Sequence, residues 1–101
     1  VEKGDPLVEF YAAIYRHDLN GFAGPDWHQE QVVSRTEALR MFTSAAAFAT
    51  FTENERGAIE VGKRANVSVF SADLMTAEPA TIPTATPLLT VSDGRVTHEA
   101  L

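Results

Sequence analysis

The chain has 101 residues, with 8 Lys and Arg against 14 Asp and Glu, and its formal net charge of -6 disfavours nucleic-acid binding and polybasic membrane contact. No apolar run approaches the ~20 residues that a transmembrane helix needs. The sequence contains no cysteine, which excludes disulfides and thiolate chemistry and fits a cytoplasmic location.

The first predicted element is a helix over about residues 6–17. Asp5 can cap its free backbone N–H groups, and Pro6 suits the first helical position. Arg16 and His17 are expected in the last turn, where cations complement the helix dipole. Apolar side chains recur at helical spacing between these ends, namely Leu7, Phe10, Tyr11, Ile14 and Tyr15.

Residues 18–33 are expected to form an irregular connection, because Asn20-Gly21 and Gly24-Pro25-Asp26 are typical turn sequences. A second helix is predicted from Ser34 to about residue 50. It begins at a capping box in which the Ser34 hydroxyl and the Glu37 carboxylate each reach the other residue's backbone N–H. The alanine-rich surface of this helix permits close approach to a neighbouring helix or sheet. We therefore expect the helix to be buried around much of its circumference.

The hydrophobic period changes to two after residue 54, which predicts strands. One is expected around Ile59 and Val61, between Gly57 and Gly62, and a second over residues 67–70. A hairpin is predicted around the dipeptide Asp93-Gly94, because a type I′ turn needs positive φ at both central residues. A two-residue loop would place Val91 opposite Val96 and Thr90 opposite Thr97. The three prolines between residues 78 and 87 favour an extended, surface-crossing connection.

The segment from Gly57 to Phe70 resembles the G-x-[IL]-x-x-G-K-x-A-D-[LFV]-x-V-[LF] element of the amidohydrolase superfamily. The helix that begins at Ser34 resembles the helix preceding that element, and the segment 89–96 resembles the closing hairpin. Asp5-Pro6-Leu7, the stretch 13–16 and the stretch 27–31 are similar to amidohydrolase family 3, which contains N-substituted formamide deformylases. The resemblance covers nearly the whole chain. Asn66 stands where the family pattern has Asp, and we interpret this as a structural variation.

The resemblance implies an α+β fragment of a longer enzyme. Residues 1–54 would be C-terminal helices of a (β/α)8 metal-dependent hydrolase barrel, and residues 55–101 would be strands of its small β-sandwich domain. The absence of an initial Met and of a signal-peptide pattern, and the change from helical to strand periodicity, also suggest a piece of something longer. The remainder of that hydrolase would be the chain's partner.

The resemblance also implies a divalent metal, usually zinc, at the mouth of the barrel, where metal-bound water hydrolyses an amide or formamide of a small-molecule substrate. The implied ligands are a His-x-His, a Lys or Glu, two further histidines and an Asp that would lie immediately before Val1. None of these positions maps onto this chain, whose histidines are His17, His28 and His98. We therefore expect no catalytic residue and no metal ligand in these 101 residues.

Several residues have a structural interpretation beside a functional one. Glu2 and Asp5 would belong to the loop after strand eight and could contact substrate, although a helix cap is the favoured interpretation of Asp5. Gly57, Gly62 and Lys63 approach a phosphate-loop pattern, but Arg64 stands where that pattern has Ser or Thr, and turn glycines are expected. Ser34, Glu37, Asn66 and Gly94 are assigned to structural motifs.

A second hypothesis is a free-standing α+β module without catalysis, in which unpaired strand edges mediate dimerisation or partner binding. A third is a regulatory protein that keeps the hydrolase fold without its activity. Because the second predicted helix is apolar on many sides, the isolated chain is expected to self-associate or to expose an apolar patch.

Overall fold

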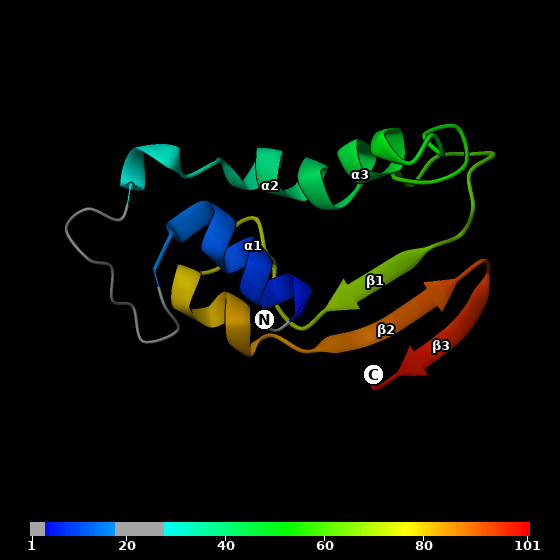
Figure 1. Ribbon diagram of the computed structural model, residues 1–101. Helices are drawn as coiled ribbons and strands as arrows, with labels where there is room; N and C mark the ends of the chain where they lie inside the picture. Colours follow the sequence, from blue (N-terminus) through cyan, green and yellow to red (C-terminus); the bar gives the residue numbers. More distant parts are fainter. Residues whose placement is uncertain (1–3, 18–27) are drawn as a thin grey trace. The chain divides into compact units, whose positions relative to one another are not determined.

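A computed structural model describes residues 4–17 and 28–101, which form helices and one antiparallel sheet (Figure 1). The elements in chain order are α1 (Pro6–Tyr15), η1 (Gln29–Gln31), α2 (Arg35–Phe42), α3 (Ser44–Ala49), β1 (Val67–Phe70), η2 (Pro79–Thr84), β2 (Pro87–Ser92) and β3 (Arg95–Glu99), where η marks a 3-10 helix. The chain divides into two compact units, the first made of Val1–Ala38 with Ala72–Ala85 and the second of Leu39–Ser71 with Thr86–Leu101. Within the described ranges, no helix is long and apolar enough to cross a membrane.

Helix α1 begins as its sequence predicts. The Asp5 Oδ1 atom accepts a hydrogen bond of 2.9 Å from the Leu7 N–H, and Pro6 occupies the first turn. The helix ends at Tyr15, because Arg16 takes a left-handed backbone with φ 53° and ψ 41°, and its N–H donates to the Ala12 carbonyl. The expectation that Arg16 and His17 lie in the last turn is therefore wrong, since both follow the end of the helix.

The first unit has a small apolar core in which α1 and η2 pack together (Figure 1). The Ile82 side chain on η2 is fully buried, at 0% exposure. The prediction of an extended connection is wrong for residues 79–84, because Pro79 opens a 3-10 helix and Pro83 fits within it. Burial of Ile82 explains why the chain turns inward here instead of crossing the surface. The core cluster consists of Phe10, Tyr11, Ala38 and Ile82.

The predicted cap at Ser34 is present, since the Ser34 Oγ atom accepts from the Glu37 N–H at 3.1 Å. The single helix predicted to about residue 50 is wrong, because the chain breaks at Thr43 into α2 and α3. The Thr43 hydroxyl donates to the Leu39 carbonyl at 2.7 Å, while the Thr43 N–H turns to the Arg40 carbonyl at 3.2 Å. The hydroxyl thus replaces the backbone donor of a regular helix, which is how threonine disturbs helices.

Among the described residues, the second predicted helix is not buried around most of its circumference. Ala38 and Ala47 are the buried residues of α2 and α3. Met41 and Phe48 remain 51% and 70% exposed. The two helices therefore have apolar side chains that residues 4–17 and 28–101 leave exposed.

The sheet has the strand order β1-β2-β3, and both pairs are antiparallel. Asp93 and Gly94 have φ values of 53° and 80°, which confirms the positive φ that the predicted hairpin turn requires. Val91 pairs with Val96 as predicted, but Thr90 pairs with His98 instead of Thr97. The register shifts between Thr90 and Val91. The two threonine hydroxyls still meet at 2.8 Å across this irregularity.

The strand predicted around Ile59 and Val61 is also wrong. This segment forms turns, and the two side chains are 86% and 107% exposed. Gly57 and Gly62 flank it with φ values of 98° and 92°, so the backbone leaves the extended region at both ends. The segment pairs with no strand of the described chain, and an isolated extended segment has no hydrogen-bonded ladder to hold it.

Candidate functional site

The three histidines each have a local partner in the structure. The His17 Nδ1 atom lies 2.6 Å from the Tyr15 carbonyl oxygen, and the two rings are stacked with centroids 3.8 Å apart. His28 Nδ1 lies 3.1 Å from Glu30 Oε1, and His98 Nε2 lies 3.1 Å from the Pro87 carbonyl oxygen. Within residues 4–17 and 28–101, no group of three or more His, Cys, Asp or Glu side chains could hold a metal ion. The described residues therefore do not fit a metal centre.

The two acids predicted to contact substrate have different outcomes. Glu2 lies outside the described residues. Asp5 is exposed and caps α1 through one carboxylate oxygen, which is the structural role that its position before Pro6 predicts. Its contact with a substrate stays a prediction.

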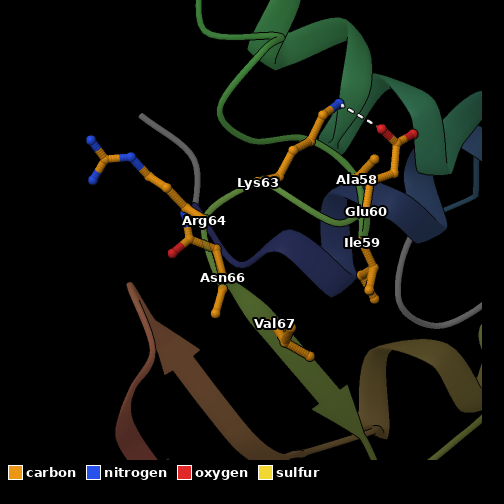
Figure 2. Close-up of a pocket in the computed structure, with 8 residues that line it drawn as sticks. Ala58, Ile59, Glu60, Lys63, Arg64, Asn66 and Val67 are labelled. Carbon is orange, nitrogen blue, oxygen red and sulfur yellow. Dashed lines mark ion pairs between the residues drawn. The ribbon is translucent and has the colours of Figure 1, made fainter.

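The loop from residue 57 to residue 67 lines a small pocket of about 180 Å³ in the second unit (Figure 2). Figure 2 shows the Lys63 and Glu60 side chains pointing toward each other, with Lys63 Nζ 3.5 Å from Glu60 Oε2. The Lys63 side chain is only 19% exposed, and Arg64 extends away from it. The pocket is lined by Ala58, Ile59, Glu60, Lys63, Arg64, Ala65, Asn66 and Val67.

Gly57 sets the position of this loop against α3. A Cβ atom added to Gly57 would lie 2.8 Å from the Ala47 Cβ atom and 3.1 Å from the Ser44 Cα atom. Gly62 also has positive φ, but an added Cβ atom there would meet nothing within 4 Å. The first glycine is therefore required by close packing and by backbone conformation, and the second by conformation alone. Both geometries agree with turn glycines.

Asn66 joins the loop to the hairpin turn. Its Oδ1 atom accepts a hydrogen bond of 2.7 Å from the Asp93 N–H, and the Gly94 N–H donates to the Ala65 carbonyl at 3.0 Å. An Asp at this position would offer the same acceptor, so the departure from the family pattern keeps the contact. Asn66 and Gly94 thus lie together in one structural motif.

Arg64 adds an ion pair that the sequence does not predict. Its Nη1 atom lies 3.4 Å from Asp93 Oδ1, and its Nη2 atom lies 4.0 Å from Glu55 Oε1. These side chains are between 42% and 66% exposed, so the pairs contribute little to stability. Arg64 and Asp93 are far apart in the sequence, and no local spacing rule brings them together. Residues 64–66 of the loop therefore contact the hairpin turn through hydrogen bonds and an ion pair.

Comparisons with known proteins identify the family. A sequence profile described as "Amidohydrolase family" matches residues 1–98. The chain therefore belongs to the amidohydrolase family. Its sequence is 27% identical over 99 residues to "Putative amidohydrolase YtcJ" of Bacillus subtilis (strain 168), covering 98% of this chain and 19% of that protein.

A second relative is the N-substituted formamide deformylase of Arthrobacter pascens. It is 35% identical over 94 residues, which are 93% of this chain and 17% of that protein. The chain thus spans about a fifth of the length of the curated relatives it matches. No solved structure matches it significantly.

Proposed function

We propose that this chain is the C-terminal part of a metal-dependent amidohydrolase that hydrolyses non-peptide C–N bonds, such as those of amides or formamides. The observation that carries the proposal is the family match over residues 1–98. The name of the Arthrobacter pascens relative supports formamides as a substrate class. Because the aligned region is under a fifth of each relative, most of such an enzyme would lie outside this chain.

The proposal assigns a place to each half of the chain. Residues 1–54 would be helices of a (β/α)8 barrel wall, and residues 55–101 would belong to a β-sandwich domain. The succession of elements supports this order, since α1, α2 and α3 precede residue 54 and all three strands follow it. The rest of the hydrolase would be the partner against which both halves pack.

The proposed metal would be held outside the described residues, which offer no ligand set. A bound divalent metal such as zinc supplies a water activated for attack on a carbonyl. Apart from the substrate contacts proposed below, the contribution of this chain would be structural, because its histidines and Lys63 are engaged in local contacts. Glu2 and Asp5 remain the proposed substrate contacts. The alternative of a free-standing interaction module finds no support in the comparisons.

Hydrolysis by the full-length gene product tests this proposal. We expect the metal-loaded protein to release formate from N-alkyl or N-aryl formamides, to lose this activity with a chelator and to regain it when metal is restored. The 101-residue chain, assayed at the same molar concentration with the same metal, should release none. Turnover by the 101-residue chain, or failure of the full-length protein on every amide and formamide tried, would contradict the proposal.

A further inference from the structure

The dipeptide at the tip of the hairpin combines a carboxyl group with an unhindered backbone nitrogen. Asp93 is the one aspartate of the chain that precedes glycine. Because glycine has no side chain, its nitrogen can approach the carboxyl carbon of the preceding residue closely. The Asp93 side chain is 66% exposed, and a Cβ atom added to Gly94 would meet nothing within 4 Å. Water therefore has free access to both reacting groups.

An aspartate in this setting can isomerise without any reagent except water. The Gly94 nitrogen attacks the Asp93 Cγ atom, and the new N–Cγ bond closes a five-membered succinimide ring. The C–O bond of the protonated carboxyl breaks, and its oxygen leaves as water together with the amide proton. A second water then opens the ring. Opening at Cγ restores aspartate, whereas opening at the main-chain carbonyl gives isoaspartate, in which the main chain runs through Cβ and Cγ.

The loop that precedes β1 holds the groups that would have to react. The Gly94 N–H donates to the Ala65 carbonyl at 3.0 Å, which engages the attacking nitrogen. The Asp93 N–H donates to the Asn66 Oδ1 atom at 2.7 Å. Arg64 Nη1 lies 3.4 Å from Asp93 Oδ1, an oxygen of the carboxyl that would be attacked. We call these three interactions the loop–turn contacts.

Ring closure is incompatible with the conformation that the loop–turn contacts hold. Asp93 and Gly94 have φ values of 53° and 80°, as a two-residue hairpin turn requires. To reach Cγ, the Gly94 nitrogen must move by rotation about the Asp93 Cα–C bond, which turns its N–H away from the Ala65 carbonyl. We propose that Asp93 is a site of isoaspartate formation, and that opening of the loop–turn contacts sets its rate.

The modification would release the hairpin from the loop. Isoaspartate adds one methylene carbon to the main chain, so the turn no longer has the two-residue geometry that joins β2 to β3. The N–H groups of residues 93 and 94 then lose their alignment with Asn66 Oδ1 and the Ala65 carbonyl. Neither the reaction nor its control by the loop involves the proposed hydrolase activity.

A comparison of the full-length protein with a synthetic peptide of residues 90–97 tests the proposal. Both are incubated at neutral pH in water enriched in heavy oxygen, which marks each succinimide that opens. Isoaspartate is then measured in the peptides of a digest by chromatography and by an enzyme that methylates isoaspartyl carboxylates. Asp73 is the internal control, because it is exposed but precedes leucine.

We expect isoaspartate to form at Asp93 of the full-length protein at least about tenfold more slowly than in the peptide, because the reaction requires local opening. It should still form faster at Asp93 than at Asp73, since the leucine side chain hinders the approach of its nitrogen. Equal rates in protein and peptide would overturn the control by the loop. A rate at Asp73 that equals or exceeds that at Asp93 would overturn the choice of site.

Two substitutions of Asn66 test the control by the loop directly. Asn66→Ala removes the acceptor of the Asp93 N–H, so isomerisation in the full-length protein should become about three- to tenfold faster. Asn66→Asp is the matched control, because it keeps a carboxylate oxygen as acceptor and should change the rate by no more than about twofold. An unchanged rate in a folded Asn66→Ala, or no isoaspartate at Asp93 in that variant, would overturn the proposal. If Asn66→Ala does not fold, the comparison of the unsubstituted protein with the peptide decides alone.

Discussion

Ile82→Ala should lower the free energy of unfolding of the first unit by about 2–5 kcal/mol. Ile82 is 0% exposed and packs with Phe10, Tyr11 and Ala38. Truncation removes buried apolar atoms and leaves a cavity between η2 and α1, which α1 cannot fill without bending. Urea unfolding of the purified protein, with hydrogen exchange of the α1 amides as a local readout, measures the loss.

Thr81→Ala is the matched control, because Thr81 lies next to Ile82 in the same 3-10 helix with its side chain exposed. Its effect should stay within about 0.5 kcal/mol, as for most surface substitutions. A loss for Ile82→Ala no larger than that of the control would show that η2 does not belong to the core of the first unit.

Gly57→Ala should lower the stability of the second unit by about 2–4 kcal/mol, the sum of backbone strain and overpacking. Gly57 has a φ of 98°, and the new Cβ atom would lie 2.8 Å from the Ala47 Cβ atom. The backbone of α3 is also close, at 3.1 Å from the Ser44 Cα atom, so the clash cannot be relieved by a side-chain rotation. Hydrogen exchange of the amides of α3 in the full-length protein reports this loss.

Gly62→Ala separates the two causes. Gly62 has a similar φ of 92° but open space around it, so its substitution should cost about 1–2 kcal/mol from backbone strain alone. Relative to the single Ala47→Gly variant, adding Gly57→Ala should cost less than Gly57→Ala does alone, because the 2.8 Å contact with the Ala47 Cβ atom is gone while the 3.1 Å approach to the Ser44 Cα atom remains. Equal losses for Gly57→Ala and Gly62→Ala would contradict the close packing of the loop on α3.

Elements whose hydrogen bonds are local were predictable from the sequence. Asp5 capping α1, Ser34 capping α2 and the Asp93-Gly94 turn each depend on residues a few positions apart. The predictions were wrong where the local structure depends on a contact with a residue distant in the sequence, or on a side chain that competes for a backbone hydrogen bond. Ile82 packs against residues of α1, and the proline-containing segment 79–84 forms a 3-10 helix instead of an extended connection. The Thr43 hydroxyl took a backbone carbonyl and divided the second helix, which apolar periodicity does not reveal.

In the candidate site, too, local features could be predicted and long-range contacts could not. The glycine turns at Gly57 and Gly62 and the acceptor role of residue 66 could be predicted, because they depend on backbone conformation and side-chain type. The contact of Arg64 with Asp93 could not, since it forms only when the hairpin folds back onto the loop. The alternation of Ile59 and Val61 predicted a strand, but a strand also needs a partner, and apolar alternation says nothing about where that partner lies.

The metal content of a triple variant tests most directly the claim that this chain supplies scaffold and that the reactive centre lies elsewhere. His17, His28 and His98 would all be replaced by glutamine in the full-length protein, and the metal bound per folded molecule would be measured by elemental analysis. We predict the same metal content and the same rate of formate release as in the unsubstituted protein. Loss of a metal equivalent from the folded variant would contradict the account, because a ligand would then lie within these 101 residues.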